Sequence, residues 1–294
     1  MAEQKIELRK VRDFSDNLND TFQFIRQNLK PLLISFLCIA GVFMLLAAIY
    51  SGLYQKDTGN LLEQIMGTGG MKDRSPSAVF NANFFLVFLF AWINIVAMQV
   101  VIIAYMKYYE QHNGATPTID EVFKIFRSYF PALLIYSLVI AIVMAFGLAF
   151  CILPGIYFIV ALMPFTCIIM IEELSFGAAF SRCFELIKDN FWISFGIYIL
   201  VYVIYSFSAG IISLIVGAVT GVLYYFTTKD LNTTVDIVSS ILNIFSFLFY
   251  IVFYVSVVLH YYNLAERRDG VGMMRKLDKI GEHTTNFDNI QEQY

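Results

Sequence analysis

The stretch FWISFGIYILVYVIYSFSAGIISLIVGAVTGVLYYF, residues 191–226, contains no charged side chain. A helix needs ~20 mostly apolar residues to cross the ~30 Å hydrocarbon core of a bilayer. As a single helix, this stretch would be about 54 Å long at ~1.5 Å per residue. It therefore predicts a helix inside a membrane, with more length than one crossing requires.

Composition extends this interpretation to the whole chain. Of the 294 residues, 59% are hydrophobic and 15% are charged, whereas soluble domains carry about 25% charged residues. The mean hydropathy is +0.67. Because charges begin at Glu3 and Lys5, ahead of any apolar run, we expect no cleavable signal peptide. The apolar runs predict six spans, over residues 31–54, 84–108, 131–153, 155–171, 191 to about 212, and 237–262.

Two short segments are expected to shape these spans. Pro154 and Gly155, within CILPGIY (151–157), are predicted to supply a tight turn between the third and fourth spans. In the long run we expect a bend at residues 208–210, Ser-Ala-Gly, because a straight helix would exceed the hydrocarbon core. A second helical piece would then cover residues 211–225.

Basic residues set the predicted orientation. If both chain ends are cytoplasmic, every lysine and arginine falls on the inside except Lys56, Lys72, Arg74 and Lys229. The positive-inside rule favours this topology over its inverse. We therefore expect a multi-pass membrane protein whose termini both face the cytoplasm.

Three amphipathic stretches precede membrane spans and share one pattern. They align on three phenylalanines, Phe22, Phe123 and Phe184. Apolar residues recur four positions before and three and seven positions after each of them, which places all on one helical face. A basic residue follows at the same offset each time: Arg26, Arg127 and Lys188. Each stretch predicts a helix lying in the cytoplasmic interface, apolar face in lipid and cation at headgroup level.

The alternation of such helices with pairs of spans predicts the architecture. We expect an all-α integral membrane protein with six transmembrane helices, in three tandem units of an interfacial helix plus a two-span hairpin. The units cover residues of about 10–110, 115–173 and 174–265, within one membrane domain (1–265) followed by a polar cytoplasmic tail (266–294). Simple anchoring of each span also explains the pattern, but the matched positions favour a true internal repeat. Thr118 and Glu121 predict a capping box for the second interfacial helix.

One segment resembles a known family. Leu153-Pro154-Gly155-Ile156-Tyr157, Pro164, Glu172-Glu173, Ala179, Arg182, Leu186, Lys188 and Trp192 follow the pattern of the bacterial proteins named after the membrane domain of glycerophosphoryl diester phosphodiesterases. Cys183 stands where that pattern has serine, and YYNLAERRDG (261–270) is similar to its terminal signature. The resemblance implies a membrane module without the phosphodiesterase catalytic domain, for which this chain has no room. The general style also resembles proteins of the Bacteroidetes.

Candidate contact residues lie at the cytoplasmic ends of the spans. Glu172 and Glu173 end the fourth span near Arg182 and Lys188, where local ion pairing and contact with a lipid headgroup or protein partner are both open. The basic residues of the interfacial helices attract anionic lipid by about 1 kcal/mol each. The residues proposed for lipid or partner contact are Phe22, Arg26, Phe123, Arg127, Glu172, Glu173, Arg182, Phe184 and Lys188.

Residues suited to catalysis or metal binding do not cluster in the sequence. His112, His260 and His283 are far apart, and the four cysteines lack the spacing of metal ligands or a disulfide framework. We expect no catalytic residue, no cofactor and no metal. Inside the spans, Asn94 and Asn243 are predicted to hydrogen-bond between helices. The four-residue spacing of Ser213, Gly217 and Gly221 permits close helix packing, within the chain or between copies, and we favour the former.

The function predicted from these features is non-enzymatic. We expect a scaffold of the inner membrane, or an integral protein that binds lipid or a partner, with membrane lipids, another membrane protein or a second copy as partners and no role for nucleic acid. The alternative is a passive conduit or transporter for lipid or an amphipathic small molecule. The absence of ionisable residues from the interior of the predicted spans disfavours active pumping.

Overall fold

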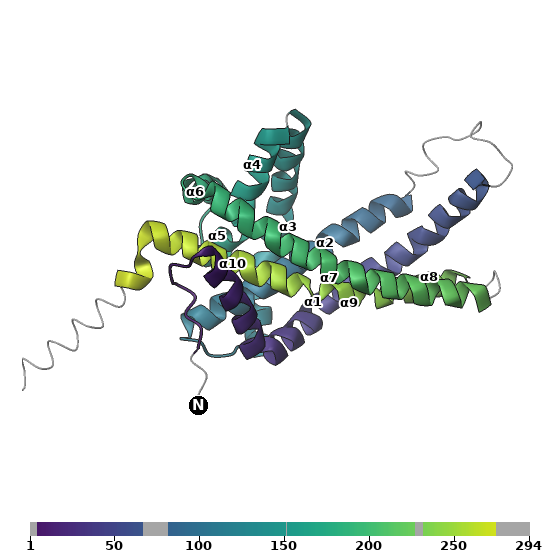
Figure 1. Ribbon diagram of the computed structural model, residues 1–294, viewed down its shortest axis with the longest axis horizontal. Helices are drawn as coiled ribbons and strands as arrows, with labels where there is room; N and C mark the ends of the chain where they lie inside the picture. Colours follow the sequence, from purple (N-terminus) through teal and green to yellow (C-terminus); the bar gives the residue numbers. More distant parts are fainter. Residues whose placement is uncertain (1–4, 67–81, 151, 227–231, 275–294) are drawn as a thin grey trace, which may run out of the picture.

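A computed structural model describes residues 5–66, 82–150, 152–226 and 232–274, and every regular element in these ranges is a helix (Figure 1). Six segments are long and apolar enough to cross a membrane: Phe14–Tyr54, Phe84–Gln111, Ile119–Ala149, Ile152–Ile171, Phe191–Leu223 and Val238–Asp269. The expected all-α fold with six potential spans is thus confirmed. The predictions that concern Lys72, Cys151, His283 and the tail beyond residue 274 lie outside the described residues.

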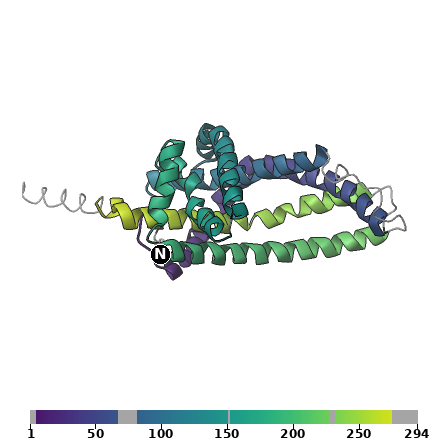
Figure 2. The ribbon, with the colours of Figure 1, turned by 90° about the horizontal axis from the view of Figure 1, so that it is seen from above.

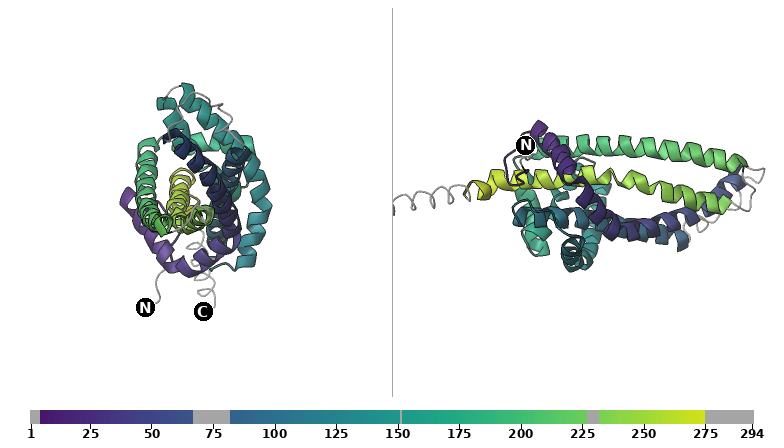
Figure 3. Two further views of the ribbon diagram at one scale, coloured as in Figure 1. Left: turned by 90° about the vertical axis from the view of Figure 1, so that its right-hand side faces the viewer. Right: turned by 90° about the horizontal axis from the view of Figure 1, so that it is seen from below.

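The first two spans form an antiparallel hairpin of α1 (Phe14–Met66) and α2 (Ala82–Gln111). The first predicted interfacial helix is the beginning of α1, with no break before the span. Figure 3 shows a bend in the early part of α1. Pro31 lies within the helix and has no N–H to donate to the preceding turn, which is the usual cause of such a kink.

The second hairpin pairs α3 (Ile119–Phe150) with α4 (Ile152–Leu162). The expectation that Pro154 and Gly155 form the turn is wrong, because both lie inside α4. Proline is tolerated in the first turn of a helix, where no N–H donor is needed. A Cβ atom on Gly155 would lie 2.8 Å from the Cα of Leu148, so this glycine allows α3 and α4 to approach closely. In Figure 1 this hairpin points away from the direction of α1, α2 and α7.

Beyond α4, the fourth span continues as the short helix α5 (Phe165–Ile171), after a break at Pro164. The third amphipathic stretch forms a separate helix, α6 (Phe176–Ile187), which a short turn joins to α7. The three interfacial stretches therefore differ in form: two are continuous with their spans and one is not. The internal repeat stays a prediction from the sequence.

The long uncharged run is one helix, α7 (Phe191–Phe226), of 36 residues. Figure 2 shows it as an unbroken rod, so the bend predicted at residues 208–210 is wrong. Backbone groups in lipid must be satisfied within the helix, and this requirement outweighs the ~1 kcal/mol disadvantage of Gly210. Trp192 is 78% exposed near its beginning and Tyr225 is 84% exposed near its end.

The last span consists of three helices, α8 (Asn232–Leu242), α9 (Ile244–Phe247) and α10 (Tyr250–Asp269). At the first interruption, the Ser246 hydroxyl donates to the carbonyl of Asn243 at 2.6 Å, and the Asn243 amide donates to the carbonyl of Ser239 at 3.1 Å. Side chains thus satisfy carbonyls where the helix is interrupted. α10 ends at Gly270, whose φ of 63° is the left-handed conformation that glycine adopts readily.

α10 is the central helix of the bundle. It is buried almost continuously from Ile251 to Glu266, and Figure 3 shows the other helices around it. It contacts α1, α2, α6 and α7. Residues 5–13, which we call the N-terminal strap, lie at the same end of the bundle as the end of α10, because the backbone N–H of Arg12 donates to Asn263. The described parts of both termini therefore meet at one end of the molecule.

Candidate functional site

The N-terminal strap is held in place by Arg12, which is 1% exposed. The Nε atom of Arg12 donates to Oδ2 of Asp20 at 2.7 Å, and its backbone N–H donates to Oδ1 of Asn263 at 2.8 Å. The carbonyl of Arg12 accepts a hydrogen bond of 2.7 Å from Nη2 of Arg267. A buried guanidinium is stable only when its donors are satisfied, and here Nη1 donates to the carbonyl of Leu8 at 2.7 Å and Nη2 donates to that of Glu7. These contacts fix the strap to both α1 and α10.

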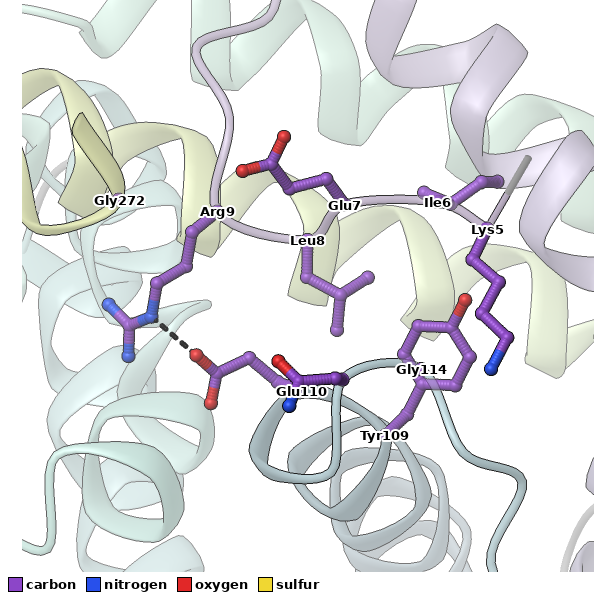
Figure 4. A pocket seen from close by; sticks show the side chains of 10 residues that line it. Lys5, Ile6, Glu7, Leu8, Arg9, Tyr109, Glu110, Gly114 and Gly272 are labelled. Carbon is purple, nitrogen blue, oxygen red and sulfur yellow. Dashed lines mark hydrogen bonds and ion pairs between the residues drawn. The ribbon is translucent and has the colours of Figure 1, made fainter. Parts of the chain in front are cut away.

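A small polar pocket of about 280 Å³ lies between the strap and the end of α2 (Figure 4). Nε of Arg9 donates to Oε1 of Glu110 at 2.8 Å, and its guanidinium lies 5.4 Å from the ring centroid of Tyr262. Burial disfavours the charged form of Arg9, but the carboxylate of Glu110 outweighs it and raises the pKa of Arg9 above its ordinary value. Since Arg9 and Glu110 pair with each other, we interpret this pocket as a structural contact between the strap and α2 rather than as a binding site.

Glu173, one of the predicted contact residues, pairs with a lysine of α2. Nζ of Lys107 donates to Oε1 of Glu173 at 2.6 Å, to the carbonyl of Met170 at 2.6 Å and to the hydroxyl of Tyr129 at 3.0 Å. Hydrogen bonds from Lys107 and Tyr129 hold the pKa of Glu173 below its ordinary value. Lys107 is 5% exposed, so most of its charge is satisfied inside the protein.

The neighbouring Glu172 also makes internal contacts. Its carboxylate accepts hydrogen bonds from Nε of Arg182 at 3.1 Å and from the hydroxyl of Tyr261 at 2.9 Å. Arg182 pairs in addition with Asp269 and Glu185. Burial disfavours the charged Arg182, but Asp269 and Glu172 outweigh this effect and raise its pKa. The structure thus supports the ion-pairing interpretation of Glu172 and Arg182, and this network connects α5, α6 and α10.

The other predicted contact residues lie largely on the surface. Phe22 and Arg26 are exposed on α1, and Phe123 and Arg127 are exposed on α3. Lys188, at the end of α6, is exposed too. Phe184 differs, because its ring is half-buried and packs against Tyr157 and Phe158 of α4 at centroid distances of 6.0 and 5.9 Å. The structure therefore does not bring the nine predicted residues together into one site. Glu172, Glu173 and Arg182 form internal ion pairs, Phe184 packs between helices, and the other five lie on separate outward surfaces.

A larger depression lies between α4, α7 and α10, and we call it the aromatic groove. Its volume is about 440 Å³, and its walls are nearly all apolar. α4 contributes Ile156 and Val160, and aromatic rings come from α7 and α10: Phe195, Tyr198, Tyr202, Tyr205, Tyr250, Phe253 and Tyr254. Edge-to-face contacts between Tyr205 and Tyr250, at 5.4 Å, and between Tyr202 and Phe253, at 6.4 Å, make its walls rigid.

Tyr198 contributes its ring to the aromatic groove. Its side chain lines the groove, and its hydroxyl is buried without a hydrogen-bond partner among the described residues. A buried hydroxyl without a partner costs free energy comparable to a lost hydrogen bond. Because it is buried, this hydroxyl lies behind the groove wall, out of reach of a molecule in the groove.

A serine and a histidine also meet inside the bundle. Nε2 of His260 lies 2.8 Å from the hydroxyl of Ser194, and both residues are fully buried. The Ser194 hydroxyl donates to the carbonyl of Asn190 at 2.8 Å, so the histidine is the donor in the Ser194–His260 contact. A nucleophilic serine would instead donate to the histidine. We therefore interpret this pair as helix packing between α7 and α10.

Neither the aromatic groove nor the strap contacts were predicted from the sequence. The sequence did offer an indication for Lys107, since it is the first charged residue after the uncharged stretch that begins at residue 75. Among the described residues, no three histidine, cysteine, aspartate or glutamate side chains form a group that could hold a metal ion. The chain matches no family model, no curated protein and no solved structure.

Proposed function

We propose that this chain is a multi-pass protein of a bacterial inner membrane that binds a lipid acyl chain in the aromatic groove and has no enzymatic activity. The observation that carries this proposal is the groove itself, with its apolar and aromatic walls. The family resemblance of residues 153–192 belongs to the same proposal, since it implies a membrane module without a catalytic domain.

The position of the groove supports a lipid as its occupant. All its lining residues lie in three of the segments that are apolar enough to span a membrane. The molecules available to a groove at that depth are lipids. Because lipid tails are as apolar as the protein surface, affinity would come from packing of the acyl chain on the aromatic rings of the groove.

The outward faces of α1 and α3 support a membrane setting with an anionic leaflet. Phe22 and Phe123 are exposed beside the cations Arg26 and Arg127. This combination is typical of helices that bury rings below the headgroups and hold basic side chains at headgroup level. We propose these residues, with Lys188, as headgroup contacts, and both termini as cytoplasmic. If the chain acts as a scaffold, we propose that a second membrane protein binds at the same outward faces of α1 and α3.

Photocrosslinking tests lipid binding directly. The full chain would be reconstituted with a phospholipid that carries a diazirine on its acyl chain, and labelled peptides identified by mass spectrometry. We expect adducts on peptides of α4, α7 and α10 that line the groove. Ile199→Trp, which fills the groove, should remove most of this labelling.

The matched control is Val139→Trp on α3, an exposed position outside the groove. It should leave groove labelling unchanged. Equal labelling of wild type and Ile199→Trp would refute the groove as a binding site. Vesicles that contain the protein and move labelled lipid between leaflets would instead favour the conduit alternative.

A further inference from the structure

The beginning of α4 lies close to the beginning of α7. The ring centroid of Tyr157 on α4 is 5.4 Å from that of Phe191, the first residue of α7. It is also 6.0 Å from the ring centroid of Phe184 on α6. Ile152, the first residue of α4, precedes Tyr157 by five residues, which is about 8 Å of helix. The α3–α4 hairpin therefore ends near the point where α7 begins, and far from the other end of α7 at Phe226.

This arrangement differs from that of a hairpin that crosses a bilayer. In a pair of crossing spans, the beginning of α4 would lie about 30 Å from the beginning of α7, on the opposite side of the hydrocarbon core. The junction of α6 and α7, which contains Lys188, is instead on the side that the basic residues predict to be cytoplasmic. Figure 1 and Figure 2 both show the hairpin running across the direction of α7 rather than alongside it.

The other four apolar segments continue together beyond the hairpin. Tyr50 of α1 stacks on Phe90 of α2 at a centroid distance of 4.3 Å. The hydroxyl of Ser213 on α7 donates to Oδ1 of Asn243 at 3.2 Å, which confirms the predicted hydrogen bond of Asn243 between helices. Asn94 of α2 is buried among these segments, although its Oδ1 atom accepts no hydrogen bond from any described residue, contrary to its predicted role. The segments that run the length of the molecule are thus α1, α2, α7 and the series α8–α10.

The free end of the hairpin is apolar and exposed. Phe146, Ile152 and Leu153, which we call the hairpin tip, are 62%, 70% and 77% exposed. The sequence contains no charged residue between Arg127, near the base of the hairpin, and Glu172. Exposed apolar surface of this kind marks a site of contact with a membrane or a partner. A cation at the base and apolar side chains at the tip match the headgroups and the acyl chains of one lipid leaflet.

We infer that the α3–α4 hairpin is inserted into the cytoplasmic leaflet without crossing the bilayer, and that acyl chains of this leaflet cover the hairpin tip. The chain then crosses the membrane four times, and both termini remain on the same side. This inference rests on the proposed membrane setting but not on lipid binding in the aromatic groove. Because the hairpin occupies one leaflet only, the protein takes up more area in the cytoplasmic leaflet than the four crossing segments alone require.

Spin labelling of the full chain in phospholipid vesicles tests this inference. In a cysteine-free background, a nitroxide on Leu153→Cys should be reached by oxygen, which dissolves among acyl chains, and protected from a water-soluble nickel complex. In doubly labelled chains it should lie nearer to a nitroxide on Trp192→Cys than to one on Phe226→Cys, since these exposed residues mark opposite ends of α7. Ile152→Cys is the second variant if Leu153→Cys does not fold, and it should give the same result.

The matched control is Phe207→Cys, because Phe207 is 72% exposed in the middle of α7. Its label should be reached by oxygen whatever the position of the hairpin. A hairpin that crosses the bilayer would reverse the order of the two distances, and a tip in water would be reached by the nickel complex. Either result overturns the inference and leaves the membrane setting intact. Access of the nickel complex to the Phe207 label would instead overturn the membrane setting, and the inserted hairpin with it.

Discussion

Nζ of Lys107 lies 2.6 Å from Oε1 of Glu173, and this ion pair joins the end of α2 to the segment between α5 and α6. Lys107 also donates to the carbonyl of Met170 at 2.6 Å. One buried cation thus connects two hairpins that are separated in the sequence. The glutamate side chain is largely exposed, so we expect the lysine to contribute more to stability than its partner does.

Replacing Lys107 with methionine should lower the free energy of unfolding by about 1–3 kcal/mol, because the buried Met170 carbonyl loses a charged donor. Thermal unfolding of the purified protein in detergent would measure this as a lower midpoint. Lys124→Met is the matched control, because Lys124 is exposed on α3, and it should change the midpoint little. Equal effects of the two substitutions would contradict the role given to Lys107.

Acidification should reveal the contribution of Glu173. Its pKa is lowered in the folded protein by hydrogen bonds from Lys107 and Tyr129, so the ionised carboxylate stabilises the fold. This stabilisation is present above the unfolded pKa, near the ordinary value of 4.5, and is lost as pH falls through the lower folded pKa. The difference in unfolding midpoint between wild type and Glu173→Gln should be constant from pH 7 to pH 6 and shrink at more acidic pH. A difference that grows on acidification would contradict a lowered pKa of Glu173 in the folded protein.

Arg12→Lys should release the N-terminal strap. Lysine cannot reproduce the planar set of donors that contacts Asp20 and the strap carbonyls, so a loss of about 2–3 kcal/mol is expected. Hydrogen exchange should then become faster in residues 5–13. Lys10→Ala, at an exposed position of the same strap, should leave exchange rates unchanged. Protection that persists in Arg12→Lys would argue against this anchoring role.

Gly155→Ala should separate the α3–α4 hairpin, because the added Cβ would lie 2.8 Å from the Cα of Leu148. Backbone movement is needed to relieve this contact, and overpacking of this kind costs about 1–3 kcal/mol. Gly221→Ala on α7 is the opposite case, since a Cβ there meets no atom of the described residues within 4 Å. It should be neutral or slightly stabilising, through the higher helix propensity of alanine. Unfolding midpoints that rank the two variants in reverse would refute this account.

Cysteine labelling should establish the orientation. In a cysteine-free background, Ser75→Cys is expected to react with a membrane-impermeant maleimide from the extracytoplasmic side. Lys188→Cys, at an exposed position, should react only after the membrane is opened. The expectation follows from the excess of basic residues on the side of the termini. The reverse labelling pattern would reject the predicted topology.

Hydrophobic run length and local capping chemistry were sufficient to predict much of the fold. Thr118 and Glu121 form the expected capping box, with the backbone N–H of Thr118 donating to Oε2 of Glu121 at 2.7 Å and that of Glu121 to the Thr118 hydroxyl at 3.4 Å. Helix interruptions were less predictable. Proline and glycine at 154–155 indicated a turn but lie in the first turn of α4, whereas Asn243 gave no such signal and adjoins a real interruption.

The candidate sites depend on packing between distant segments, which a single sequence does not reveal. The aromatic groove joins residues of α4 to residues of α10 about a hundred positions later. The glycines at 217 and 221 show the converse difficulty. Their spacing favoured close packing within the chain over packing between copies, but added Cβ atoms at both would meet no atom of the described residues within 4 Å, so the favoured prediction is wrong. Helical periodicity identifies a face without identifying what that face contacts.

The unbroken length of α7 has a consequence for how the chain sits in a bilayer. At a tilt of 40°, near the upper end of the usual range, a helix of about 54 Å spans about 41 Å of membrane thickness. That distance matches the ~40–45 Å of a bilayer with its headgroup layers, and it would place Trp192 and Tyr225 at opposite interfaces, where such side chains are enriched. A steeply inclined α7 makes the angle of this helix sensitive to lipid chain length, so shorter lipids would incline it further.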